Sequence, residues 1–253
     1  MSEVRVEKSD GVMIVTIDRP EAKNAVNKPV ALGIAAAMDE LDESSDLSCA
    51  VLTGAGGTFC SGMDLKAFLT GELPRLPGRG FAGLVEKPPR KPLIAAVEGF
   101  ALAGGFELLL ACDLVVAARG AKLGIPEVKR GLVAGAGGLM RLPRTVPRAI
   151  AMEWILTGDF ITAQRAYEVG LINRVVEDGR ALESALELAR AIAKNGPLAV
   201  ATSKQVIIES VDWAADEMWA KQAPIVGPVF TSEDAKEGAA AFAQKRVPQW
   251  KGR

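Results

Sequence analysis

The sequence predicts an α/β fold, because two kinds of apolar pattern alternate along the chain. Short runs rich in β-branched residues, such as residues 12–18, indicate buried strands. Other runs place an apolar residue every three or four positions, as at Val30, Ile34 and Met38, which is typical of a helix that packs one face on a core. With 253 residues, 49% of them hydrophobic, the chain can form one large domain or one domain with an appendage.

The N-terminal part predicts a hairpin and a helix. Residues 4–7 and 12–18 flank the turn sequence at residues 9–11, which predicts two antiparallel strands. The helix that follows has Asn27 as its N-cap and Pro29 in its first turn.

Two irregular segments follow the predicted strand at residues 49–53. The glycine-rich residues 54–62 lack both the third glycine of a dinucleotide-binding fingerprint and the Gly-Lys pair of a P-loop, and a tight turn is the commoner role of such a run. Residues 70–92 are dense in proline and glycine. A loop of this length is usually a mobile lid, a binding segment or disordered, and we predict that it forms the wall of a pocket.

The second half of the chain is mainly helical. Three helices and one strand or extended connector are expected at residues 149–157, 162–170, 182–192 and 171–176. The sequence Asn195-Gly196-Pro197 then interrupts the pattern, and we divide the chain there into residues 1–195 and a C-terminal helical region, residues 196–253. In the last helix, Thr231 and Asp234 predict a capping box.

The central stretch, residues 95–127, carries the most informative pattern. Gly104 and Gly105 open an apolar run whose only charge is Glu107. If a helix begins near Gly104, its first amides have no partner within the helix and can bind an anion or a developing oxyanion, and Glu107 lies one turn further on. The alternative is a glutamate that is solvated or ion-paired at a helix edge.

Charge and composition exclude several classes of function. Positive and negative side chains number 30 and 31, which gives no support to nucleic acid or an anionic membrane as the main partner. We expect neither a membrane span nor a secretory signal. Cys49, Cys60 and Cys112 lie far apart, as expected of reduced thiols in a cytoplasmic protein. Because the chain has no histidine, acid/base chemistry falls to carboxylates, lysines, Tyr167 or the thiols.

Seven segments together resemble the crotonase, or enoyl-CoA hydratase/isomerase, family. They lie in register across the chain, at residues 19–27, 57–66, 95–107, 126–127, 135–138, 156–159 and 237–246. The resemblance implies a spiral of ββα units with C-terminal helices that form a homotrimer, often as a dimer of trimers. It also implies an acyl-CoA thioester as substrate, with neither a metal nor a further cofactor.

The resemblance assigns site residues by position. The Met63 and Gly104 amides would form an oxyanion hole, and Glu107 and Glu127 would be catalytic. The residues beside coenzyme A would be Ala22 and Lys23 near the phosphates, Ser61, Asp64 and Leu65 near the adenine, and Phe242 and Lys245 from the last helix, across a subunit boundary.

Because both glutamates are present, the resemblance favours an enoyl-CoA hydratase, which adds water syn and reversibly to a trans-2-enoyl-CoA to give a 3-hydroxyacyl-CoA. Our hypothesis is that Glu127 handles the C2 proton, while Glu107 activates a water that the Gly135 amide helps to hold. An isomerase or another crotonase-type reaction is the alternative, and a non-catalytic acyl-CoA binding protein is the third reading.

The chain departs from the family pattern at four positions. Ala103 stands where a glycine is common, and Met63, Phe106 and Ala134 also differ from the usual residues. We expect the bulkier groups to narrow or redirect the acyl pocket.

Overall fold

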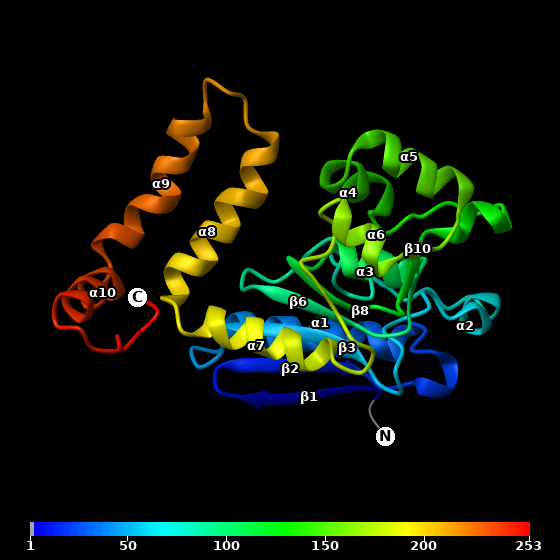
Figure 1. Ribbon diagram of the computed structural model, residues 1–253, viewed down its shortest axis with the longest axis horizontal. Coiled ribbons are helices and arrows are strands. Elements are labelled where there is room, and N and C mark those ends of the chain that lie inside the picture. Colours follow the sequence, from blue (N-terminus) through cyan, green and yellow to red (C-terminus); the bar gives the residue numbers. More distant parts are fainter. Residues whose placement is uncertain (1–2) are drawn as a thin grey trace.

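A six-stranded sheet forms the centre of the computed structural model, which describes residues 3–253 (Figure 1). In spatial order its strands are β1 (Val4–Ser9), β2 (Val12–Ile17), β3 (Cys49–Gly54), β6 (Leu93–Val97), β8 (Leu114–Ala118) and β11 (Arg174–Val176). The first two strands are antiparallel and the remaining neighbours are parallel. The predicted hairpin is therefore confirmed, and its turn has positive φ at Asp10 (53°) and Gly11 (76°), as a tight two-residue hairpin turn requires.

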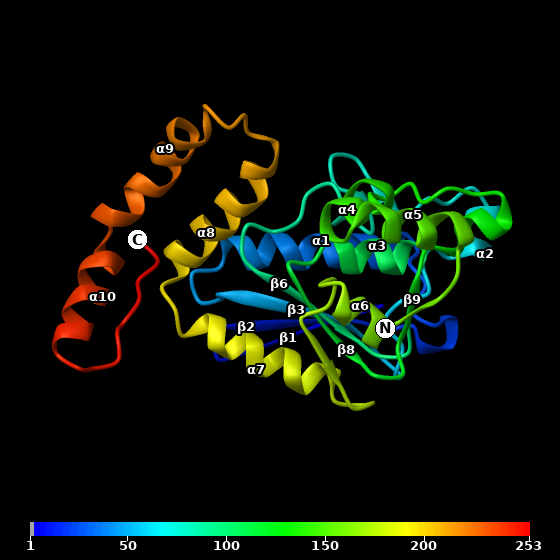
Figure 2. The same cartoon turned by 45° about the horizontal axis from the view of Figure 1, so that its top comes forward.

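Helices cover both faces of this sheet (Figure 2). Successive strand residues point to opposite faces, so Cys49 and Val51 pack with Ala185 of α7 (Ala181–Ala193), whereas Ala50 and Leu52 belong to the larger core with α1 (Lys28–Glu43). Asn27 caps α1 as predicted, since its Oδ1 accepts from the Val30 amide at 3.0 Å. Burial on both faces confirms the α/β class read from the sequence.

The remaining elements are short. The helices are α2 (Leu65–Leu69), α3 (Gly104–Leu110), α4 (Gly138–Thr145), α5 (Arg148–Thr157), α6 (Ala163–Glu168), α8 (Pro197–Glu209), α9 (Met218–Thr231) and α10 (Glu233–Ala243), with 3-10 turns η1 (Pro20–Ala22), η2 (Pro126–Arg130) and η3 (Ser210–Asp212). Two small sheets contain β10 (Ile161–Thr162), β9 (Lys122–Gly124) and β7 (Phe100–Leu102), and β4 (Arg75–Leu76) with β5 (Gly80–Phe81). Among the helices of residues 3–253, none has the length and apolarity needed to cross a membrane.

Helices α8, α9 and α10 lie to one side of the sheet and its covering helices (Figures 1 and 2). Lys204 of α8 joins them to the core, because its Nζ donates to Asp113 Oδ2 at 2.6 Å and to the Lys91 carbonyl at 3.0 Å. Asp113 also accepts from the Leu93 amide, which fixes α8 to the end of β6. We retain residues 1–195 and 196–253 as a proposed division.

The predicted capping box is wrong in its residues. Thr231 is the last residue of α9, and Ser232 instead caps α10, accepting from the Ala235 amide at 2.9 Å. Asp234 is buried and accepts from the Lys251 and Gly252 amides, so this carboxylate holds the C-terminal tail rather than the helix end.

The proline- and glycine-rich residues 70–92 form an ordered wall rather than a loose lid. They contain the β4–β5 hairpin, and Ala82, Leu84 and Val85 are buried in the main core. The side chain of Phe81 reaches α3, where a Cβ built on Gly104 would lie 2.6 Å from the ring.

Candidate active site

The start of α3 is brought beside residues 60–63 by backbone pairing. Cys60 donates to the Phe100 carbonyl at 2.8 Å and accepts from the Leu102 amide at 3.1 Å. A Cβ on Gly105 would lie 2.1 Å from the Cys60 carbonyl oxygen. Only glycine therefore permits this close approach of the two segments.

Met63 and Gly104, whose amides are predicted to form the oxyanion hole, belong to these two neighbouring segments. Val26 donates to Gly62 and accepts from Asp64, so the intervening Met63 amide points away from Val26. Gly104 is the first residue of α3 and has no acceptor within the helix. A Cβ on Gly62, the residue before Met63, would lie 3.2 Å from the Gly104 nitrogen, so the two segments pass close to each other.

The turn before α3 is strained at Ala103. Its φ of 52° and ψ of −127° are a conformation that favours glycine. We expect Ala103→Gly to stabilise the protein by about 1 kcal/mol, because relief of the strain outweighs the greater entropy of glycine in the unfolded chain. The urea midpoint would rise with an unchanged m-value. A lower midpoint would show that the alanine methyl contributes packing that exceeds its strain.

Glu107 projects from α3 into a buried setting and is only 3% exposed. Its Oε1 accepts from the Ala136 amide at 2.7 Å and the Gly138 amide at 2.9 Å. Burial raises the pKa of Glu107, while these two hydrogen bonds and the charge of Arg141 oppose that rise. The reading of Glu107 as a solvated glutamate at a helix edge is thus excluded.

The loop after Ala134 supplies two amides to Glu107. The amides of Ala136 and Gly138 bind its carboxylate, while Gly135 is exposed, and the role of the Gly135 amide in holding a water stays a prediction. A Cβ on Gly138 would lie 3.1 Å from Glu107 Oε1, so glycine is needed there. The glycine cluster at residues 135–138 signalled a close approach but not which amide makes it.

Glu127 lies on η2, close enough to Glu107 for their charges to interact. Burial raises the pKa of Glu127 to about 7, its own backbone amide opposes the rise, and the negative charge of Glu107 adds to it. Its Oε2 is buried and has no hydrogen-bond partner within residues 3–253. The two carboxylates are therefore electrostatically coupled, and one of them retains a proton more readily than an isolated glutamate.

The predicted coenzyme A residues fall into two groups. Ser61 donates its amide to the Lys23 carbonyl at 3.1 Å, and Lys23 lies over the Phe100 ring at 5.3 Å. Ala22 precedes Lys23 at the end of η1, and Leu65, which is 51% exposed, begins α2 next to Asp64. These five residues thus gather at one rim of the site.

Asp64 is committed to other partners at that rim. Its carboxylate pairs with Arg19 at 3.0 Å and caps α2 by accepting from the Lys66 and Ala67 amides. Although partial burial acts in the opposite direction, these hydrogen bonds lower its pKa. Arg19, which the sequence reading did not single out, therefore orders the rim.

Phe242 and Lys245 form the second group and lie far from the first. Phe242 lies in the last turn of α10 and Lys245 just after that helix, which is at the left of Figure 1, whereas α2 is at its right. Phe242 is 88% exposed. A single chain does not bring these residues to its own candidate site.

Two of the departures from the family pattern are core residues. Phe106 is fully buried in the main core and Ala134 is also buried there. Their effect on the shape of the acyl pocket stays a prediction. Met63 remains partly exposed, and Phe81 borders Gly104 instead.

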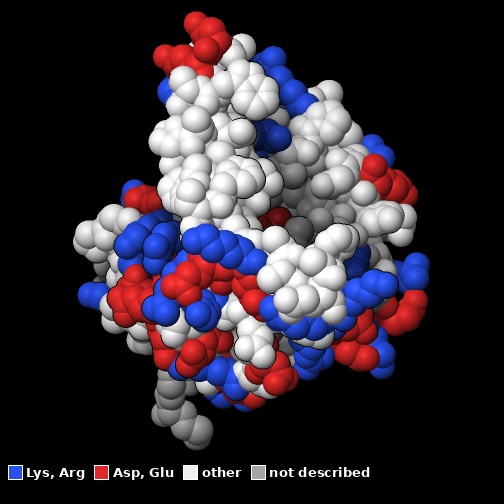
Figure 3. All heavy atoms as spheres, turned by 90° about the vertical axis from the view of Figure 1, so that its left-hand side faces the viewer, with Lys and Arg blue, Asp and Glu red and all other residues white. Residues whose placement is uncertain are grey.

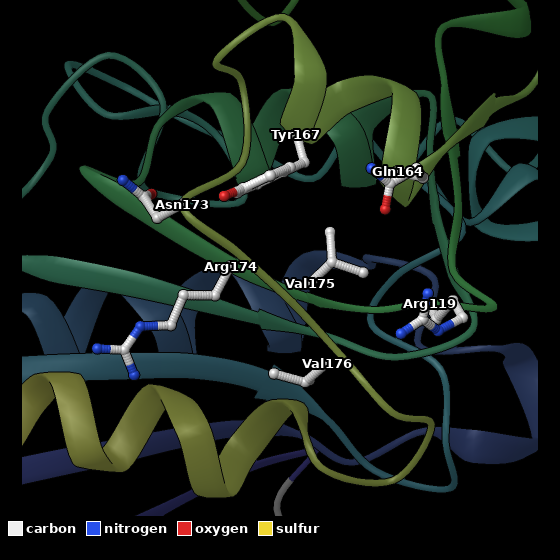
Figure 4. Close-up of a pocket in the computed structure, with 7 residues that line it drawn as sticks. All are labelled: Arg119, Gln164, Tyr167, Asn173, Arg174, Val175 and Val176. Atoms are coloured by element: carbon white, nitrogen blue, oxygen red, sulfur yellow. The ribbon is translucent and has the colours of Figure 1, made fainter.

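Two surface hollows lie away from the carboxylates. One, of about 360 Å³, lies beside β11, where Tyr167 and Gln164 of α6 overhang Val175 (Figure 4). Another, of about 670 Å³, lies between the end of α1 and α8. Neither is lined by a residue predicted for the site. Among residues 3–253, no group of three or more acidic or cysteine side chains could hold a metal ion.

Comparisons with known proteins agree over the full chain. The family profile described as "Enoyl-CoA hydratase/isomerase" matches residues 7–253. The chain is 44% identical to enoyl-CoA hydratase EchA19 of Mycobacterium tuberculosis, over 98% of this chain and 96% of that protein, and 41% identical to a carnitinyl-CoA dehydratase of Salmonella arizonae over the whole of both. A crystal structure of enoyl-CoA hydratase EchA1 from Mycobacterium marinum has a TM-score of 0.98 at 58% identity, and a probable enoyl-CoA hydratase/isomerase from Mycobacterium abscessus has 0.97 at 62%, both over the whole of each chain. The predicted crotonase-like spiral is thereby confirmed, and the chain belongs to the enoyl-CoA hydratase/isomerase family.

Proposed function

We propose that the protein is an enoyl-CoA hydratase, which adds water syn and reversibly to a trans-2-enoyl-CoA to give a 3-hydroxyacyl-CoA. The observation that carries this proposal is the electrostatically coupled pair of carboxylates, buried Glu107 and half-buried Glu127, in a chain where the segments that carry Met63 and Gly104 lie close together. The names of the relatives support the same reaction.

The geometry supports a division of roles between the acids. Glu107, whose Oε1 accepts two amide hydrogen bonds, is the carboxylate better suited to stay ionised and take a proton from the water that attacks C3. Glu127, with a pKa of about 7, gives a proton to C2. The thioester oxygen gains negative charge as the C3–O bond forms, and two amide donors would stabilise it by about 3 kcal/mol each.

A panel of thioesters tests this function. It should contain 2-enoyl-CoA and 3-enoyl-CoA esters of several lengths, together with carnitinyl-CoA because one relative acts on that compound. We expect loss of the conjugated thioester absorbance and a 3-hydroxyacyl product from at least one 2-enoyl ester. Shift of a double bond without hydration would favour an isomerase, and binding without any turnover would favour a non-catalytic binding protein.

The rate of hydration should fall as the pH rises through about 7. Glu127 must hold a proton in order to donate it, and its raised pKa means that this proton is lost above that pH. Because the two acids are coupled, the limb of the kcat/KM profile belongs to the pair. The residual activity of Glu107→Gln should show this limb at a lower pH. The negative charge of Glu107, which adds to the rise in the pKa of Glu127, is absent in that variant. A profile that is flat between pH 6 and 9 would exclude Glu127 as the acid.

We also propose a homotrimer, or a dimer of trimers, held by the C-terminal helices. Large apolar side chains are exposed on α9, among them Trp219 (80%) and Phe230 (78%). Figure 3 looks at the side of the molecule that carries α8–α10, and uncharged atoms cover much of its upper part. Exposed apolar area of this kind usually marks an interface. Such an assembly would let Phe242 and Lys245 reach the coenzyme A of a neighbouring subunit.

Trp219→Glu should dissociate the assembly, because it places a charge in the apolar contact. Sedimentation velocity should show monomers, whereas Leu156→Glu, at an exposed apolar site on α5, should leave the mass unchanged. An unchanged mass for Trp219→Glu would remove α9 from the interface.

The cysteines support a reducing, cytoplasmic location as a further part of the proposal. Cys49, Cys60 and Cys112 are free, and burial raises the pKa of Cys49 and of Cys60 to about 12. Such thiols are neutral packing groups that do not depend on an oxidising compartment.

A further inference from the structure

Arg141 of α4 links three segments that meet at the candidate site. Its Nη2 donates to the Val85 carbonyl at 2.5 Å, which ties α4 to the wall formed by residues 70–92. A Cβ on Gly137 would lie 2.2 Å from Arg141 Nη1, so the guanidinium lies directly against the backbone of Gly137. The side chain is only partly exposed. An arginine held in this way is a fixed part of the structure.

Arg141 packs against Gly137, which lies between the two residues whose amides bind Glu107. Ala136 and Gly138 flank Gly137, and both donate to Glu107 Oε1. Moving the guanidinium would therefore free the loop to move, and with it both hydrogen bonds. Arg141 also lies close enough to Glu107 for their charges to interact: burial lowers the pKa of Arg141, and the charge of Glu107 opposes that change.

The other ionisable groups around Glu107 do not replace this charge. Glu127 on η2 repels it, and Arg130 interacts with Glu127. Burial raises the pKa of the Cys112 thiol, so this thiol is neutral, and neighbouring Asp113 is paired with Lys204. Within residues 3–253, Arg141 is the cation whose charge acts on Glu107.

We propose that Arg141 is a positioning residue, which holds the loop at residues 134–138 in place and keeps Glu107 ionised for attack by water. This inference rests on the proposed hydratase function. It gives a reason for an arginine in a partly buried position, where an unpaired cation would be unfavourable.

The test compares Arg141→Met and Arg141→Lys with Arg144→Met, measuring kcat and KM for a short 2-enoyl-CoA across pH. Arg144 lies three residues later in the same helix and is exposed, with an ion pair to Asp212, which makes it a matched control. For Arg141→Met we expect the acidic limb of kcat/KM to move up by about one pH unit, the low end of what an opposite charge near a carboxylate produces. The sign follows because loss of the cation raises the pKa of Glu107, which then becomes ionised only at higher pH.

At pH values below this limb the same variant should lose about tenfold in kcat, as a shift of one unit implies, with little change in KM, and the loss should shrink at higher pH, where Glu107 is ionised in both proteins. Arg141→Lys should restore the limb because it keeps the charge, and Arg144→Met should match the wild type. If Arg141→Met does not fold, Arg141→Gln, which keeps a donor for Val85, carries the same test. An acidic limb that stays in place while the melting temperature falls would overturn the proposal and leave a purely structural arginine. Absence of hydration by the wild type would instead contradict the proposed function.

Discussion

Glu107→Gln and Glu127→Gln are each expected to lower the hydration of a short trans-2-enoyl-CoA by at least about a hundredfold, the usual contribution of a positioned acid or base. Glutamine at position 107 can still accept the Ala136 and Gly138 hydrogen bonds through its oxygen, but it cannot take a proton from water. Glutamine at position 127 removes the group whose raised pKa suits proton donation to C2. The first variant would lose removal of the proton from water, and the second would lose donation of a proton to C2.

The measurement is the decay of the conjugated thioester absorbance, with sedimentation to show that the assembly is intact. Both substitutions preserve size, and Glu168→Gln on the exposed side of α6 is the matched control, which should change the rate by less than about twofold because exposed residues away from special features rarely matter. Exchange of the C2 proton with solvent should be lost in Glu127→Gln. Near-normal turnover by either variant would remove that residue from the mechanism.

The position of Glu107 could be predicted from the sequence because local pattern fixes it. A glycine pair that opens an apolar run indicated where α3 begins, and a single charge in that run indicated a carboxylate with a special environment. Both signals depend on residues close together in the chain. The partner acid Glu127 required the family resemblance, since no periodicity relates residues 107 and 127.

The details that sequence reading missed depend on backbone direction. Which amide of residues 135–138 faces Glu107 is decided by torsions such as the φ of 100° at Gly137, which no side-chain pattern specifies. Similarly, Thr231 and Ser232 are both good caps, and the choice depends on where α9 ends. The composition of residues 70–92 predicted a loop. Leu84 and Val85 are nevertheless buried, because they pack in the main core, which forms only in the tertiary structure.

Gly62→Ala is expected to lower kcat/KM by about a hundredfold, as the loss or misplacement of one oxyanion donor does. Gly62 has a φ of 101°, and a Cβ there would lie 3.0 Å from the Ala103 Cβ and 3.2 Å from the Gly104 nitrogen. Neither neighbour is the end of a flexible side chain. The backbone must therefore shift between Met63 and Gly104, and the two amides of the proposed oxyanion hole would no longer bind one oxygen.

Gly57→Ala separates this effect from a general loss of stability. Gly57 also has positive φ, at 72°, but a Cβ there would meet nothing within 4 Å. Both variants should lose about 1 kcal/mol or more of folding free energy from backbone strain, whereas only Gly62→Ala should lose activity. Binding of a saturated acyl-CoA, measured by calorimetry, should weaken much less than kcat/KM falls, because the interaction that is lost strengthens as negative charge develops on the thioester oxygen. Equal activity of the two variants would mean that the amides of Met63 and Gly104 do not act together, and the reaction would need a different source of stabilisation for that charge.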